Sequence, residues 1–287
     1  MRPVASSIIP LVDAAELRNQ QRTGLWLDGH SGLYTVADAL SFMNEVGVAL
    51  RYVAAANLPA ASMYRATQCH VPLPEDEKTA HARAFELMNG LLATGKVVEI
   101  NVIGNRLSLA LERILTAIYA LVRRNREEPT VSDAARQALD FIVSNDTAST
   151  GEVRRLLGAE GQRRPDAADL ALAELQRELL VDRGPSAGPS KGVFYLTREG
   201  YPYRVFATSH PEIVASARNL GQQEAAAQLV TMYLAAAPFA TRRSLLGLFR
   251  LVLCAEEIND AIEMLVSAGC VHLVRLRKNE LVVYDGV

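Results

Sequence analysis

Two stretches of the chain show the same pattern ninety residues apart. The segment "ALAELQRELLVDR" at 171–183 and the segment "AIEMLVSAGCVHL" at 261–273 each place apolar residues at helical spacing. Both then pass directly into a short extended piece, near Val181 and near Val271. A helix that leads straight into a strand must bury its apolar face and also cover the edge of that strand. This repeat therefore restricts the fold before it says anything about function.

The elements around both repeats follow one order. Residues 129–205 contain three helical segments and then two extended arms around the tip "GPSAGPSKG". Residues 206–287 again contain helical segments, followed by the hairpin sequence "CVHLVRLRKNELVVYD". Three helices and a hairpin form a winged helix-turn-helix. We predict a mainly α fold with small β-hairpins (α+β), built from tandem winged helix-turn-helix modules.

Shifts in composition divide the remaining sequence. Gly24, Gly29 and Gly32 make the start of the chain rich in turns, which predicts an irregular or partly helical N-terminal segment at 1–32. Residues 33–128 contain an amphipathic helix capped by Thr35, further helices and the strand "VVEINVI", typical of a first winged-helix-like unit. The predicted domains are 1–32, 33–128, a second winged-helix unit at 129–205 and a third at 206–287.

Composition favours a globular protein without a membrane segment. Apolar residues make up 49% of the 287 residues and charged residues 22%, and the longest apolar runs are too short to span a bilayer. The N-terminus lacks the pattern of a secretion signal, so we expect a cytoplasmic protein. The three cysteines are far apart and form no CxxC pair, which argues against disulfides and a zinc site. We expect no cofactor and no metal.

The charge pattern restricts how such modules could bind DNA. The net charge is -2, so phosphate contacts would need a local basic patch. The predicted third helices carry several carboxylates, which repel phosphates. Basic residues lie instead on the predicted second helices, on the connection "QRRP" and at the wing tips. The predicted DNA-binding residues are Arg154, Arg155, Arg163, Arg164, Lys191, Arg242, Arg243 and Lys278. The alternative is that these are ordinary hydrated charges.

Three segments carry a resemblance to a known family. They are "YTVADALSFMNEVGVAL", "GNRLSLALERILTAIYALVRRN" and "ALAELQRELLV". From about residue 33 onward the chain resembles the AlkZ-type (YcaQ-like) DNA glycosylases, and more closely their shorter AlkZ-related relatives of unassigned activity. The resemblance implies tandem winged helices in a C-shaped molecule that embraces DNA. Active members of the family hydrolyse the N-glycosidic bond of alkylated or crosslinked purines.

The catalytic motif of that family is altered in this chain. Active members use a Gln, apolar, Gln or Asp motif, whose polar groups position water and stabilise a developing sugar cation. The matching segment is "FMNEVGV", in which Asn44 and Glu45 are polar but the third position is Val46 or Gly47. Glu45 could act as a base and Asn44 could orient water. A polar pair near a helix end is also a common solvated cap.

These observations lead to one preferred function and two alternatives. The preferred function is nonspecific binding of double-stranded DNA by a repair-linked relative of the glycosylases whose catalytic motif is degenerate. The first alternative is an active DNA glycosylase for alkylated purines, with Asn44 and Glu45 at the reaction centre. The second is a regulatory or protein-interaction scaffold whose acidic third helices bind a protein partner.

Overall fold

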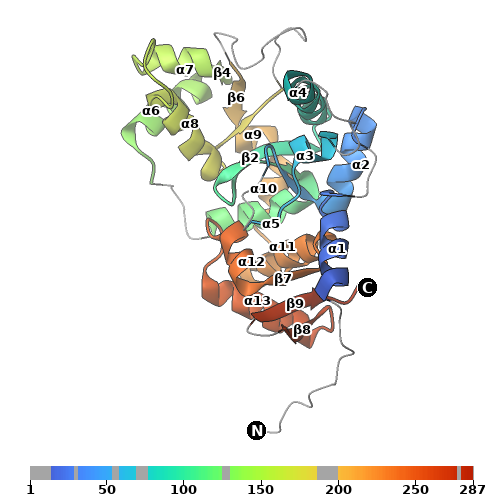
Figure 1. The fold of residues 1–287 in the computed structure, drawn as a ribbon. Helices are drawn as coiled ribbons and strands as arrows, with labels where there is room; N and C mark the ends of the chain where they lie inside the picture. Colours follow the sequence, from blue (N-terminus) through green and yellow to red (C-terminus); the bar gives the residue numbers. More distant parts are fainter. Residues whose placement is uncertain are drawn as a thin grey trace.

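The fold comes from a computed structural model, which describes residues 14–28, 32–53, 58–68, 77–124, 130–185, 200–276 and 279–286. Figure 1 shows helices that surround small antiparallel sheets, as the sequence predicts. No helix within these ranges is both long enough and apolar enough to cross a membrane.

Three modules repeat one order of elements, helix–strand–helix–helix–strand–strand. The first module contains α2 (Val36–Val46), β1 (Val48–Leu50), α3 (Met63–Gln68), α4 (Glu77–Ala93), β2 (Val97–Ile103) and β3 (Arg106–Leu111). The second contains α6 (Asp133–Ser144), β4 (Thr147–Ser149), α7 (Thr150–Leu156), α8 (Ala167–Arg177), β5 (Val181–Arg183) and β6 (Pro202–Val205). The third contains α11 (Gln222–Ala236), β7 (Phe239–Thr241), α12 (Arg242–Phe249), α13 (Ala255–Ser267), β8 (Val271–Leu276) and β9 (Asn279–Tyr284).

The strands confirm that the modules are equivalent. In each module the last strand lies between the other two, in the orders β1-β3-β2, β4-β6-β5 and β7-β9-β8, and every described pairing is antiparallel. This is the winged-helix arrangement, so the predicted fold class is correct. The division of the chain at 32, 128 and 205 stays a prediction.

The repeated passage from helix to strand is real, and it occurs in all three modules. In each, the backbone has a positive φ two residues before the strand begins, at Gly95 (72°), Leu179 (49°) and Gly269 (72°). Glycine adopts this conformation without steric cost, whereas in leucine the Cβ atom makes it strained. Leu179 is buried, and its side chain belongs to the core shared by the first and third modules. The backbone strain therefore coincides with a contact that ties the second module to the other two.

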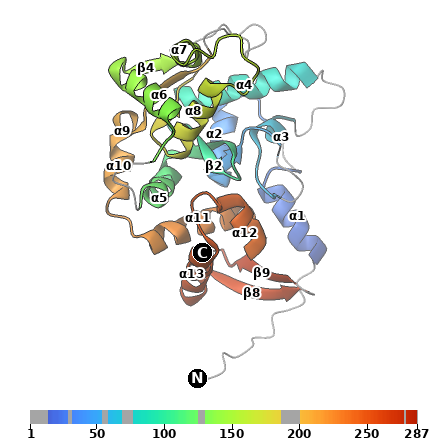
Figure 2. The same ribbon diagram turned by 90° about the vertical axis from the view of Figure 1, so that its left-hand side faces the viewer.

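The cores show how the modules are joined. One continuous core runs through the first and third modules, and the second module has a separate core. The helices α5 (Glu112–Arg123), α9 (Phe206–Ser209) and α10 (Pro211–Ala217) connect the modules, and residues of all three are buried in the shared core. Figures 1 and 2 show the second module near the top and the third at the bottom, with α5 between them.

The segment before the first module contains a helix that packs on the third. This helix is α1 (Ala14–Gly24), and its Leu17 packs against Leu281 and Val283 of β9. The first wing also reaches the third module, because the amide of Gly104 donates a hydrogen bond to the Leu248 carbonyl at 2.7 Å. The helix that precedes the first module and the wing of the first module therefore both contact the third module.

Two sheets merge where the first and second modules meet. Strands β2 and β5 pair antiparallel, with Glu99 opposite Arg183, and the result is one six-stranded sheet in the order β1-β3-β2-β5-β6-β4. Each of these strands would otherwise be an open sheet edge, which natural proteins usually cover. At the junction, β2 and β5, the edge strands of the two wings, therefore cover each other.

A buried ion pair closes the turn between α7 and α8. Arg154 donates from Nε to Asp166 at 2.5 Å and from Nη2 to Asp169 at 2.9 Å, and the Asp166 side chain is only 1% exposed. Burial alone would raise the pKa of Asp166. Hydrogen bonds from the Asp169 amide and from Arg154 outweigh it, and the pKa lies below its usual value.

This pKa shift predicts an acid-sensitive contribution to stability. Because the pKa of Asp166 is lower in the folded state than in the unfolded chain, the stabilisation is present above about pH 4 and is lost as pH falls through the folded value. We expect Asp166→Asn to lower the free energy of unfolding by about 3 kcal/mol at pH 7 and by less at pH 3. Urea unfolding at both pH values measures this. Asp140→Asn, at an exposed carboxylate on α6, should change little. An equal loss for Asp166→Asn at both pH values would contradict the assignment.

Candidate nucleic-acid interface at the junction of the first two modules

Three charged side chains lie buried at the β2–β5 junction. The Glu99 carboxylate pairs with Arg183 Nη2 and with Arg51 Nη1, the latter at 3.5 Å. The side chains of Arg51, Glu99 and Arg183 are 7%, 2% and 6% exposed. Charges are costly to bury, and their pairing offsets only part of that cost. Burial disfavours the charged form of Arg51, but Glu99 and nearby tyrosines outweigh it and hold the pKa of Arg51 above its usual value.

Aromatic rings surround the two arginines. Arg51 Nη2 donates to the Tyr201 hydroxyl at 2.9 Å, and Arg183 Cζ lies 3.8 Å from the centroid of the Tyr201 ring. Arg51 also lies 5.3 Å from the ring of Tyr52 and 5.7 Å from that of Phe85, within the range of cation–π attraction. We call Arg51, Phe85, Glu99, Arg183 and Tyr201 the junction cluster. Tyr52, which is 46% exposed, connects it to the molecular surface.

The junction cluster does not satisfy all of its own polar atoms. Arg51 Nε, Glu99 Oε1 and Arg183 Nε are buried and have no hydrogen-bond partner among the described residues. Nearly all buried polar groups in native proteins are paired, so an exception marks a place for water or for a ligand. Here three exceptions occur around one carboxylate.

A cleft of about 280 Å³ lies beside the junction cluster, between the first two modules. Strands β2 and β3 line one side with Asn101 and Leu107, and the second module lines the rest. Three guanidinium groups reach the cleft, those of Arg154, Arg164 and Arg183, against one carboxylate, Asp169. We call this the arginine cleft. Its chemistry favours a ligand that accepts several hydrogen bonds.

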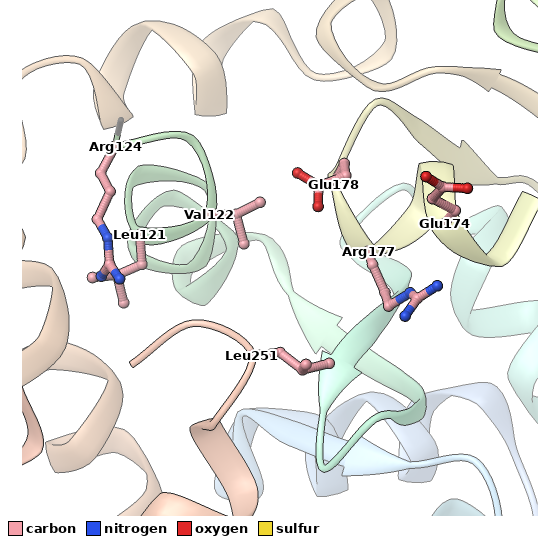
Figure 3. Close-up of a pocket in the computed structure, with 7 residues that line it drawn as sticks. All are labelled: Leu121, Val122, Arg124, Glu174, Arg177, Glu178 and Leu251. Carbon is pink, nitrogen blue, oxygen red and sulfur yellow. The ribbon is translucent and has the colours of Figure 1, made fainter. Parts of the chain in front are cut away.

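A larger cleft of about 410 Å³ lies between α5, the second module and the third module. Figure 3 shows Arg124 at the end of α5 on one side, Glu174 and Arg177 of α8 and the following Glu178 on the other, and Leu251 between them. Several of these charges have protein partners: Arg124 pairs with Glu257 at 2.6 Å, and Glu174 accepts hydrogen bonds from the amide and hydroxyl of Ser132. Carboxylates on its wall make this cleft a poor place for phosphate.

A third cavity, of about 560 Å³, lies between α1, α3 and β7. Its wall combines apolar side chains with Arg18, Arg22 and Arg65, and Arg22 is paired with Asp28. None of the residues that line this cavity belongs to the junction cluster.

The arginines predicted to bind DNA fall into two groups. Arg155, Arg163 and Arg164 are exposed in the second module, and Arg243 is exposed on α12 of the third. Figures 1 and 2 show α7 near the top of the molecule and α12 in its lower half, so these groups do not form one patch. Lys191 and Lys278 lie outside the described residues.

Arg154 and Arg242 are paired with side chains of the protein itself. Arg154 is the buried partner of Asp166 and Asp169 described above. Arg242 pairs with Glu280 at 3.2 Å and donates to Asn259 Oδ1 at 2.5 Å. Sequence spacing places both on second helices but says nothing about these acidic and amide partners.

The third helices differ in how far they are open to solvent. In α8, every residue from 171 to 177 is buried or half-buried, because one face packs on the core of its module and another on β2. Only the first turn of α8, where Ala167 and Leu170 are exposed, is open to a major groove, and the rest of the helix is covered. In α13, by contrast, Glu256, Asp260 and Glu263 are exposed.

Asn44 and Glu45 are exposed at the end of α2 and line none of the three clefts described above. Glu45 Oε2 accepts a hydrogen bond from the indole of Trp26 at 2.8 Å, and the Asn44 carbonyl accepts one from Arg113 at 2.6 Å. Within the described ranges, no group of three His, Cys, Asp or Glu side chains could hold a metal ion.

The sequence contains a signal for the junction cluster. Each of its charged residues sits in or beside an apolar strand, as in "VALRYV", "VVEINVI" and "LLVDRG". A lone charge in such a strand is rarely buried without a partner. Three such charges therefore point to one buried network, although the sequence does not say which strands meet.

No known family profile matches the chain, and no curated protein matches it in sequence. Among solved structures, the chain is similar to Streptomyces sahachiroi DNA glycosylase AlkZ, with a TM-score of 0.55 and 13% sequence identity. The similarity covers 94% of this chain and 69% of that protein. At this identity the likeness concerns the fold. The chain thus has an AlkZ-like fold, and the resemblance inferred from the sequence is confirmed at that level.

Proposed function

We propose that this protein binds double-stranded DNA through its phosphates, as a repair-linked relative of DNA glycosylases. The observation that carries the proposal is the AlkZ-like fold over 94% of the chain, since the similar protein is a DNA glycosylase. The exposed arginines of the second module support it, because phosphate contact depends on local positive charge and not on the net charge of -2.

The fold favours phosphate contact over reading of bases. Because β2 covers α8 beyond its first turn, the exposed side chains left for a major groove there are those of Ala167 and Leu170, which offer no hydrogen-bonding group to base edges. The α7–α8 connection, in contrast, exposes Arg163 and Arg164 next to Arg155. Contacts from such residues fix a protein on the duplex without selecting sequence. The proposed binding is therefore nonspecific and dependent on salt.

Charge reversal tests the proposed surface. We expect Arg155→Glu, Arg163→Glu and Arg164→Glu together to weaken duplex affinity at least a hundredfold at about 50 mM salt. The slope of log K against log salt should also decrease by roughly 2.7, since each lost phosphate contact accounts for about 0.9. Fluorescence anisotropy with a labelled duplex measures both values.

The matched control reverses the same number of exposed arginines elsewhere, at Arg136, Arg218 and Arg250. Its effect on affinity should be several-fold smaller, because it changes only the long-range field. Equal losses in the two triple variants would contradict the proposed surface. Absence of duplex binding by the wild type at low salt would contradict the proposed function.

An active glycosylase is the enzyme alternative. Glu45 and Asn44 would then position the attacking water, yet both are exposed and the third polar group of the motif is missing. We expect no release of free base from an alkylated duplex in single-turnover assays, by wild type or by Glu45→Gln. Release by the wild type that Glu45→Gln abolishes would overturn this expectation and establish the alternative.

A protein-interaction role has one observation in its favour. The exposed face of α13 combines Glu256, Asp260 and Glu263 with Met264 and Val266, which are 40% and 39% exposed. An acidic face with apolar contacts fits a basic protein partner better than DNA. This role gains support only if the wild type fails to bind duplex.

A further inference from the structure

We propose that the arginine cleft is a binding site for one phosphate group. The site itself does not depend on DNA binding. The inference rests on the proposed function only if the bound phosphate is part of DNA. The residues that carry it are Arg164, Gln176 and Arg183.

Two buried donors in the wall of the cleft lack an acceptor. The Gln176 residue is 2% exposed and Arg183 is 6% exposed, and both line the cleft. Gln176 Nε2 and Arg183 Nε have no hydrogen-bond partner among the described residues. A buried donor without an acceptor costs free energy, and an oxyanion bound in the cleft would remove that cost.

The charges around the cleft favour an anion. Asp169, the carboxylate on its wall, is already paired with Arg154, which also binds Asp166. Glu99 behind the wall is shared by Arg51 and Arg183. The four arginines thus exceed the three carboxylates by one charge, and Arg164 supplies it at the exposed rim.

Phosphate fits these donors better than a carboxylate or a neutral base. Its oxygens accept from several directions, and guanidinium groups bind them with strong charge-assisted hydrogen bonds. A volume of about 280 Å³ holds a phosphate together with part of an attached sugar. Inorganic phosphate, a nucleoside 5′-monophosphate and a 5′-phosphate at a DNA end share this chemistry.

Calorimetric titration of the full chain with inorganic phosphate tests the site. We expect saturable binding by the wild type and a loss of about tenfold or more in Arg164→Gln and in Gln176→Met, each of which removes donors from the cleft. Arg136→Gln is the matched control, since Arg136 is an exposed arginine on α6 of the same module and does not line the cleft. Its phosphate affinity should equal that of the wild type.

A second arm identifies the source of the phosphate. Affinity is compared for thymidine 5′-monophosphate, for thymidine, and for duplexes with a 5′-phosphate or a 5′-hydroxyl end. A phosphate site of either kind prefers the monophosphate over thymidine. Tighter binding of the monophosphate than of the phosphorylated duplex end assigns a free nucleotide, and the reverse order assigns DNA. The preference for a phosphorylated over an unphosphorylated ligand must disappear in Arg164→Gln and persist in Arg136→Gln.

Failure of this inference differs from failure of the proposed function. No saturable phosphate binding, or equal binding by the wild type, Arg164→Gln and Gln176→Met, would overturn the site even if duplex binding is intact. Saturable phosphate binding that Arg164→Gln removes would support the site even if the protein does not bind duplex. Arg164 is exposed, so its substitution leaves the core intact and the comparison valid if Gln176→Met is poorly folded.

Discussion

The buried contact of Glu99 with Arg51 and Arg183 is the interaction on which the arrangement of the first two modules depends. It lies where β2 meets β5, and the register there pairs Glu99 with Arg183. So short a strand pairing gives little stability by itself. The charged network and the insertion of Leu179 into the neighbouring core therefore hold the sheets together. Removal of Glu99 would leave two buried arginines without their carboxylate, which is far more costly than loss of a surface pair.

The contacts between modules use the wings and a third helix, the elements with which single winged-helix domains bind DNA. The edges of two wings pair with each other, the first wing contacts α12, and α8 is covered by β2. Surfaces left for ligands lie at the connections and in the clefts between modules. The arginine cleft and the exposed arginines of the α7–α8 connection belong to the same side of the second module, so a phosphate group in the cleft and a duplex on that surface are compatible.

The sequence was sufficient to predict local structure and repetition. Helical spacing before Val181 and Val271 predicted the passage from third helix to strand, and the structure places a positive φ two residues before each of these strands. The sequence could not predict contacts across the chain. Glu99 and Arg183 are 84 residues apart, and no pattern in either strand selects the other. Arg154 shows the same limit: its place on a second helix suggested contact with DNA, and the sequence did not indicate that Asp166 and Asp169 pair with it.

The most direct test of this account is hydrogen exchange in Glu99→Gln, which keeps the shape of the side chain and removes its charge. The account predicts that backbone amides of β2 and β5 exchange at least tenfold faster together, while those of β8 and β9 in the third module keep the wild-type rate. Unchanged exchange in β5 would show that the charged network does not join the modules. That result would contradict the central claim.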